Sequence, residues 1–248
     1  MKRILYLIPG PMPKKEQLRR QEIANAFVKE SQVEVKAVEG PLSIESAVEE
    51  EMAVPSLLRS LLKIGKSYDA VVLGCFGDPG LRAARELADV PVIGPAEATF
   101  MFASMIGDRF GVLTSLERDI PTTRALAIKY EMGHRLVSIR PLNIPVLDLG
   151  KNREVTIGRV VEEGKKAEKH DGAEVLILGC MSLAFLLIDE FVANELDIPL
   201  LNPAKIGIRT AETFASLKLT HSRKTYPKAD YEKLAKSIFK EELRNESI

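Results

Sequence analysis

The sequence has no tryptophan, only three histidines and only two cysteines among its 248 residues. Two cysteines are too few for a disulfide framework or a four-cysteine zinc site. The histidines, His134, His170 and His221, lie far apart in the chain and lack the spacing of metal ligands. We therefore expect no metal site.

An excess of charge of either sign is also missing, because 35 basic side chains are balanced by 35 acidic ones. Domains that bind nucleic acid are usually strongly basic, so we expect no nucleic-acid partner. Long apolar runs are missing too. The run Ile4–Ile8 is ended by Pro9, and Leu183–Ile188 is far shorter than the ~20 residues that span a bilayer. These absences predict a cytoplasmic protein with reduced thiols and no membrane partner.

The composition is that of a folded protein, with 46% hydrophobic and 28% charged residues. The length allows one large domain or two small ones. Short apolar runs rich in β-branched residues alternate with longer segments of helical periodicity. This alternation predicts an α/β fold, in which parallel sheets are flanked by helices on both faces.

Strands are expected at residues 4–8, 33–38, 70–73, 92–93, 110–114, near 136–139, and at 175–178 and 199–201. Helices are expected at residues 14–30, 43–64, 79–87, 95–106, 121–130, 154–169, 183–195, 204–216 and 227–243. The helix over 43–64 is expected to be interrupted before Pro55. The basic cluster Lys14, Lys15, Arg19 and Arg20 is expected on a solvated helix face.

An internal repeat divides the chain. Residues 70–75, Ala-Val-Val-Leu-Gly-Cys, resemble residues 175–180, Val-Leu-Ile-Leu-Gly-Cys, and residues 88–96 resemble residues 196–204. We therefore expect two similar lobes related by a pseudo-twofold axis, the first over residues 1–105 and the second over residues 106–216. The remaining C-terminal helix, within residues 217–248, is expected to pack back on the first lobe. Two related lobes leave a cleft between them, and we expect the active site there.

The repeat places the two cysteines, Cys75 and Cys180, at equivalent positions. Each follows a buried strand and a glycine and precedes a helix, at the end of the strands where parallel α/β sheets bind ligands. Asp78 and Ser182 are expected to cap the two helices, with Pro79 as the first helical residue after Asp78. A helix N-terminus favours a thiolate, and its unpaired amides suit a developing enolate oxygen.

Two interpretations of the cysteines follow. Buried cysteines usually act as small hydrophobic residues, which would fit a two-lobed protein that only binds a small molecule. However, the two cysteines of the chain share one repeated position, which favours a functional pair. Two thiols that face each other across a cleft suit acid/base chemistry. A thiolate removes a proton from a carbon beside a carbonyl, and the other thiol returns a proton to the opposite face, which inverts the carbon without a cofactor.

Several motifs carry a resemblance to a known family. Residues 75–81 read Cys-Phe-Gly-Asp-Pro-Gly-Leu, and further matches lie at residues 40–46, 53–55, 93–94, 103–105, 109–110, 144–147, 171–174 and 178–180. In these motifs the chain resembles the hydantoin and allantoin racemases of the aspartate/glutamate racemase superfamily, in order, over residues 1 to about 216. The resemblance implies a two-lobed fold with the active site between the lobes.

By the same resemblance, Cys75 and Cys180 are the acid/base pair. The amides that follow each cysteine and three hydroxyl side chains would line the substrate pocket; the residues are Phe76, Gly77, Met181, Ser182, Ser43, Thr114 and Ser115. Family members usually end the first strand with an Asn-Pro-Asn loop that touches the substrate, and here that loop contains Pro9-Gly10. Met181-Ser182 also departs from the small residues that the family favours after its second cysteine. These differences predict a pocket that is more apolar or smaller.

The sequence thus predicts a cofactor-independent racemase of 5-substituted hydantoins or allantoin, an isomerase that acts on a small molecule and forms a homo-oligomer. Within the superfamily, the alternatives are an aspartate- or glutamate-type racemase, a cis–trans isomerase or a decarboxylase. The decarboxylases that the chain resembles keep only one cysteine. An alternative from another class is a non-catalytic, two-lobed protein that binds a small molecule.

Overall fold

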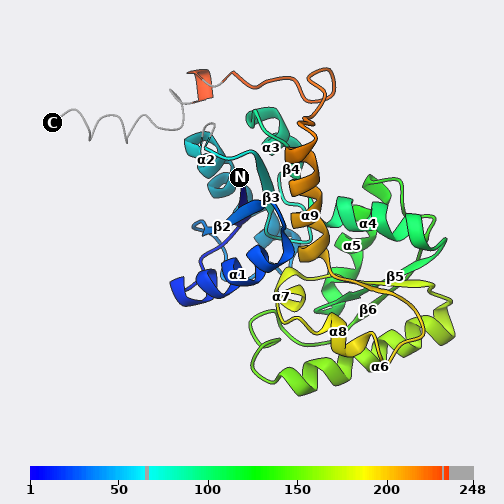
Figure 1. The fold of residues 1–248 in the computed structure, drawn as a ribbon. Coiled ribbons are helices and arrows are strands. Elements are labelled where there is room, and N and C mark those ends of the chain that lie inside the picture. Colours follow the sequence, from blue (N-terminus) through cyan, green and yellow to red (C-terminus); the bar gives the residue numbers. More distant parts are fainter. Residues whose placement is uncertain (65–66, 231, 235–248) are drawn as a thin grey trace.

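The computed structural model describes residues 1–64, 67–230 and 232–234 and contains two four-stranded parallel sheets flanked by helices (Figure 1). The strands are β1 (Lys2–Ile8), β2 (Ser31–Ala37), β3 (Ala70–Leu73), β4 (Val92–Ile93), β5 (Phe110–Thr114), β6 (Leu136–Pro141), β7 (Val175–Leu178) and β8 (Leu200–Leu201). The helices are α1 (Lys14–Phe27), α2 (Ala47–Ile64), α3 (Leu81–Leu87), α4 (Pro95–Ile106), the 3-10 turn η1 (Glu117–Asp119), α5 (Ile120–Lys129), α6 (Arg153–Asp171), α7 (Met181–Ala184), α8 (Asp189–Val192) and α9 (Pro203–Ser216).

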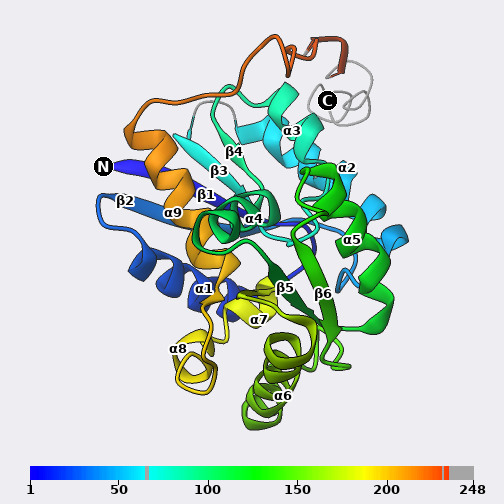
Figure 2. The same ribbon diagram turned by 90° about the vertical axis from the view of Figure 1, so that its right-hand side faces the viewer.

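The two sheets have the same topology. The strand order is β2-β1-β3-β4 in the first and β6-β5-β7-β8 in the second, so each strand of one lobe has a counterpart four strands later. The central strands β3, β5 and β7, and β1 from Ile4 onward, are buried and mostly apolar, as is usual for strands covered on both faces by helices. The predicted fold class, α/β with two similar lobes, is confirmed (Figure 2).

The repeat extends to single hydrogen bonds at the strand ends. The backbone N–H of Gly74 donates to the Leu7 carbonyl at 2.7 Å, and that of Gly179 donates to the Leu113 carbonyl at 2.7 Å. A Cβ at either glycine would lie 2.9 Å from that carbonyl oxygen, closer than real Cβ atoms come. Glycine therefore lets the chain approach the neighbouring strand on both sheets, and it fixes where the cysteine that follows must lie.

Two helices are exchanged between the lobes. Helix α9 belongs to the second lobe in the sequence prediction, but it packs on β1, β3 and α4. In Figure 1 it is the orange helix beside elements of the first lobe. Helix α4 in turn contacts β7 of the second sheet, and its Phe100 stacks on Phe110 of β5 with ring centroids 5.3 Å apart. The covering of each sheet thus depends on a helix from the other half of the chain.

Three helices differ from the sequence expectation. Helix α2 continues through Pro55, which is exposed, so the carbonyl that loses its hydrogen bond to the proline lies on the solvent side. Helix α3 begins at Leu81 instead of Pro79, because Asp78 and Gly80 both adopt positive φ angles (52° and 66°) that interrupt the helical backbone. The helix expected over 183–195 is divided into the short helices α7 and α8, with Leu187 at φ 52° between them.

The segment after α9 contacts the first lobe. The N–H of Ala229 donates to the Glu86 carbonyl, and the backbone N–H of Val92 donates to Nε2 of His221 at 2.8 Å. This segment is not helical over residues 217–230, and most of the amphipathic helix expected at 227–243 lies outside the described residues. In the described part of the chain, no helix has the length and apolar character to cross a membrane.

Candidate active site

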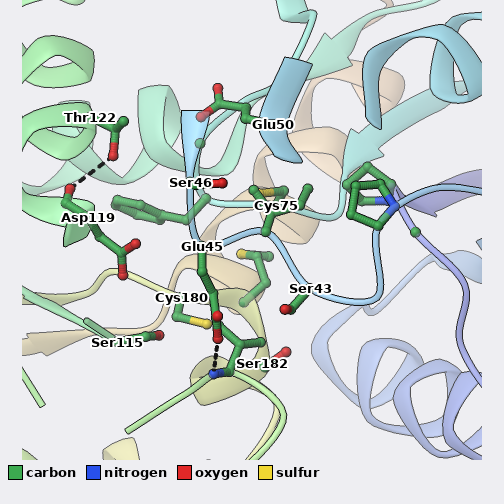
Figure 3. A pocket seen from close by; sticks show the side chains of 18 of the residues that line it. Ser43, Glu45, Ser46, Glu50, Cys75, Ser115, Asp119, Thr122, Cys180 and Ser182 are labelled. Carbon is green, nitrogen blue, oxygen red and sulfur yellow. Dashed lines mark hydrogen bonds between the residues drawn. The ribbon is translucent and has the colours of Figure 1, made fainter. Parts of the chain in front are cut away.

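A cavity of about 390 Å³ lies between the lobes, at the carboxyl ends of the central strands. The residues expected to act or to bind substrate all line it: Pro9, Gly10, Ser43, Cys75, Phe76, Gly77, Thr114, Ser115, Cys180, Met181 and Ser182. Figure 3 shows the two cysteines among these lining side chains, Cys75 from the first lobe and Cys180 from the second. The volume is in the range of small-molecule sites. The structure therefore brings together residues up to 173 positions apart in the sequence, from Pro9 to Ser182.

Cys75 is half-buried and lies two residues beyond the end of β3. Burial raises the pKa of its thiol above the ordinary value, a hydrogen bond from the Gly77 backbone N–H opposes the rise, and the carboxylates of Glu50 and Asp78 add to it. The sequence, by contrast, predicts a helix N-terminus that favours the thiolate and so lowers this pKa. The helix instead begins at Leu81, six residues after the cysteine, so its terminal amides do not act on Cys75.

Cys180 holds the equivalent position after β7 and is also half-buried and free. Cys180 itself, and not Ser182 as expected, is the N-cap residue of the short helix α7. Ser182 lies within that helix, where its Oγ accepts a 3.1 Å hydrogen bond from Nη2 of Arg20 on α1. The second cysteine therefore belongs to a segment that is tied to the opposite lobe.

Asp78 does not cap the helix that follows Cys75. Its carboxylate instead accepts hydrogen bonds from the backbone N–H groups of Ala96 and Glu97 at the start of α4, at 3.1 and 2.9 Å, and from the hydroxyl of Tyr130 at 2.8 Å. Burial raises the pKa of Asp78 to about 7, against the effect of these hydrogen bonds. The residue joins the loop after Cys75 to the helix that crosses to the other lobe.

The remaining expected residues differ in what their side chains offer to a ligand. Thr114 Oγ1 already donates to Asp119 at 3.0 Å, so only its acceptor capacity is free. The Ser43 and Ser115 hydroxyls form no hydrogen bond within the described residues. Phe76 and Met181 are buried in the core, at 5% and 3% exposure. A ligand in the cavity can therefore contact mainly their backbone atoms.

Sequence reasoning missed Arg20, which was expected on a solvated helix face. It is buried at 6% exposure and lines the cavity, with Nε donating to Glu16 at 2.9 Å and its guanidinium 5.0 Å above the Phe185 ring. The spacing held a signal, since Arg20 precedes Ala24 by four residues and Phe27 by seven and so shares their buried face.

Two carboxylates of the cavity were also missed. Glu45 lies among the lining side chains in Figure 3. It is buried and joins the lobes, because Oε1 accepts from the Val146 backbone N–H at 2.6 Å and Oε2 pairs with Arg118 at 2.8 Å. Glu50 lies against Gly77, where a Cβ would come within 3.0 Å of Oε2, and burial raises the pKa of its carboxyl. Glu45 lies in the motif at residues 40–46, but the contacts of both carboxylates are with distant segments, which the sequence does not indicate.

In the described ranges, no three histidine, cysteine, aspartate or glutamate side chains gather in a way that would hold a metal ion. What the cavity offers are two thiols from opposite lobes, backbone amides beside each thiol, free serine hydroxyls and one buried guanidinium. Such a set can move protons and hold a developing negative charge.

Comparisons with known proteins show which family the chain is similar to. Residues 21–211 match the family described as Asp/Glu/Hydantoin racemase. The chain is 38% identical to a hydantoin racemase of Pseudomonas sp. (strain NS671), over 75% of each chain, and 33% identical to a hydantoin racemase of Rhizobium meliloti, over 69% of this chain and 71% of that protein. The structure resembles that of an allantoin racemase from Klebsiella pneumoniae with a TM-score of 0.84 at 28% identity, covering 93% of this chain and 95% of that one.

Proposed function

The chain belongs to the Asp/Glu/hydantoin racemase family, and we propose that it interconverts the enantiomers of a hydantoin-like cyclic ureide, with Cys75 and Cys180 as the acid and the base. The observation that carries the proposal is that two thiols, at matching strand ends of two lobes, line one cavity. A hydantoin or allantoin substrate is favoured because proteins of that name are similar to this chain in sequence and fold.

In the proposed reaction, one proton is removed from the substrate and another is added to it. The thiolate of one cysteine takes the hydrogen from C5 of the hydantoin ring, and the electron pair of that C–H bond is delocalised onto the neighbouring carbonyl oxygen. The thiol of the other cysteine then donates its proton to the opposite face of C5. One turnover leaves the substrate inverted and the two cysteines with exchanged protonation states. No electron is lost or gained, so the proposal needs no cofactor.

The residues around the cysteines have complementary roles in this proposal. The backbone N–H groups of Phe76 in one lobe and of Met181 and Ser182 in the other would bind the enolate oxygen and ring carbonyls, and the Gly77 N–H, which is bonded to Cys75, would hold the thiolate. Ser43 and Ser115 would position the ring through their hydroxyls. Pro9 and Gly10 would form an apolar wall of the pocket, because neither residue has a side-chain amide that could bind the substrate.

The proposal is tested by proton exchange and optical rotation with purified protein. We expect racemisation of 5-substituted hydantoins or allantoin, incorporation of solvent deuterium at C5, and no comparable activity on aspartate or glutamate. Cys75→Ser and Cys180→Ser should each lose racemisation, while each retains exchange of at most one enantiomer. Full turnover by both single variants would refute the two-thiol mechanism, and activity on an amino acid alone would refute the substrate class.

A further inference from the structure

Glu50, in the first turn of α2, lines the cavity from the first lobe, and Figure 3 shows it together with Cys75. The residue is half-buried, and its carboxylate forms no hydrogen bond or ion pair with the residues that the structure describes. Burial raises the pKa of this carboxyl above its ordinary value, as expected for an acceptor that has lost water without gaining a donor. The free protein therefore holds an acceptor at the cavity wall that a ligand can satisfy.

The other carboxylates that line the cavity differ from Glu50 in this respect. Glu45 and Asp119 each accept two bonds within the fold, at 2.6 and 2.8 Å for Glu45 and at 2.9 and 3.0 Å for Asp119. Glu51, the next residue of α2, is exposed. In the described part of the chain, Glu50 is therefore the lining carboxylate that combines partial burial with free acceptor oxygens.

The Glu50 carboxylate packs against the chain just after Cys75. A Cβ added at Gly77 would lie 3.0 Å from Oε2 of Glu50 and 3.2 Å from Oε1. Gly77 is not among the residues with positive φ, so its missing side chain makes room for the carboxylate and is not required by the backbone. Cys75 precedes Gly77 by two residues, and ~3.8 Å separates consecutive Cα atoms, so the acceptor lies within reach of a small ring that is bound at the Cys75 thiol.

An unpaired carboxylate beside the reacting thiol suits a hydrogen-bond donor on the substrate. In a hydantoin ring, the reacting carbon C5 is bonded to N1, which carries a hydrogen, and to C4, which carries a carbonyl oxygen. A ring whose N1–H faces Glu50 has its C4 oxygen on the other edge, away from the negative charge of the carboxylate. The enolate charge then develops where backbone N–H groups can bind it.

The charges of the cavity also disfavour a substrate carboxylate near Glu50. Of the two cations that line the cavity, Arg20 is paired with Glu16 at 2.9 Å. The other, Lys129, is exposed and forms no ion pair within the described ranges. A dicarboxylate such as aspartate would therefore meet like charge at this wall, whereas a neutral ureide brings a donor to it.

We propose that Glu50 is a specificity-determining residue, whose carboxylate accepts a hydrogen bond from the N1–H of the hydantoin ring. The inference rests on the proposed function and deepens it, since it fixes which edge of the ring faces the first lobe. A site that hydrogen-bonds a substrate N–H rejects an analogue that lacks it, because the acceptor is then left unpaired. The enzyme therefore selects hydantoins whose N1 is unsubstituted, whatever group C5 carries.

The first test compares substrates that differ in one ring nitrogen. The value of kcat/KM for racemisation is measured with 5-methylhydantoin and with its N1-methyl and N3-methyl derivatives. N1-methylation should lower kcat/KM of the wild type by about tenfold or more, and it should cost Glu50→Ala much less, because the acceptor that it leaves unpaired is gone. N3-methylation should change kcat/KM by the same factor in both proteins. An equal effect of N1-methylation in both proteins, or a difference at N3 alone, would overturn the inference.

The second test measures binding without turnover. In a Cys180→Ser background, the concentration of 5-methylhydantoin that halves the rate of Cys75 alkylation by iodoacetamide gives its dissociation constant. Glu50→Ala should raise this constant about tenfold, and Glu50→Gln should raise it less, because the amide keeps an acceptor oxygen. Glu22→Ala, at an exposed position on α1, is the control and should leave the constant unchanged. Equal constants in Glu50→Ala and its parent would overturn the inference.

The failures of this inference and of the proposed function are distinguishable. Racemisation in which N1-methylation costs the wild type and Glu50→Ala the same would overturn the role of Glu50 and leave the two-cysteine racemase standing. Protection of Cys75 that depends on Glu50, in a protein that racemises no hydantoin, would support the contact and overturn the proposed function. A protein that neither binds nor racemises these hydantoins would overturn both.

Discussion

The carboxylate of Glu45, in the loop before α2, accepts a 2.6 Å hydrogen bond from the backbone N–H of Val146, 101 residues later in the other lobe. The second oxygen of the same carboxylate pairs with Arg118 of that lobe. Ser43, two residues earlier, lines the cavity. The contact therefore holds one wall of the candidate active site closed against the second lobe.

Replacement of Glu45 should weaken both stability and substrate binding. Glu45→Ala removes a hydrogen bond to a charged, buried acceptor, which is worth about 1.5–3 kcal/mol, whereas Glu45→Gln keeps an oxygen for Val146 and loses mainly the ion pair with exposed Arg118. We expect unfolding free energies in the order wild type, Gln, Ala, with KM rising in the same order, measured by urea unfolding and initial rates. Glu22→Ala, at an exposed position on α1, serves as the control. Equal KM values in all three proteins would contradict the role of this contact.

Glu50 should disfavour the thiolate of Cys75, which iodoacetamide alkylation can measure. Its charge raises the pKa of the Cys75 thiol, so Glu50→Gln should lower that pKa and accelerate alkylation of Cys75 at a fixed pH in the Cys180→Ser background. Glu51→Gln, at the exposed neighbouring position, should have a much smaller effect. Slower alkylation in Glu50→Gln would contradict the prediction.

Asp78 should make stability fall with rising pH. Its pKa is about 7 in the folded protein against an ordinary value of 3.8, so between these values the folded state binds more protons than the unfolded state. The free energy of unfolding therefore decreases as the pH rises through this window. Asp78→Asn removes this titration, and its stability relative to the wild type should improve from pH 5 to pH 8, by urea unfolding at both values. Asp197→Asn, at an exposed site, should show the same pH dependence as the wild type, and parallel curves for Asp78→Asn would refute the prediction.

Glu16 should act in the acid range with the opposite sign. Hydrogen bonds from Arg19 and Arg20 lower its pKa to about 2 from an ordinary 4.5, so its contribution to stability is present above pH 4.5 and is lost as the pH falls toward 2. Glu16→Gln should therefore be less stable than the wild type at pH 7, with a smaller difference at pH 3, as measured by urea unfolding. A difference that stays constant down to pH 3, or that equals the effect of Glu22→Gln, would show that the two arginines do not stabilise the folded state through Glu16.

Much of the fold followed from the sequence, because the signals for it are local. The apolar runs that form β1, β3, β5 and β7 are short and contain β-branched residues, and those of β1, β3 and β7 are followed by proline or glycine. The repeated Leu-Gly-Cys placed both cysteines at strand ends in one cavity. By contrast, the exchange of α4 and α9 was not predictable, because an apolar helix face indicates that the helix is buried but not which sheet it packs on.

The sequence predicted the two cysteines of the candidate site and their neighbours in the chain, but not the charged side chains around them. Local motifs indicated Cys75, Cys180 and their neighbours. Arg20, Glu45 and Glu50 act through partners that are far away in the sequence or on another element, so only the folded chain reveals them. The capping role of Asp78 failed for a similar reason, because its positive φ turned the carboxylate toward α4.

The exchange of α4 and α9 has a consequence for the order in which the protein is made. The buried face of α9, with Ala204, Ile208 and Ala211, covers β1 and β3, which are synthesised at the start of the chain. A nascent chain that has not yet reached residue 203 leaves that apolar face of the first sheet uncovered. The hydrophobic core of the first lobe is therefore complete only after the second lobe has been translated. The two thiols can be brought together in one cavity only after that point.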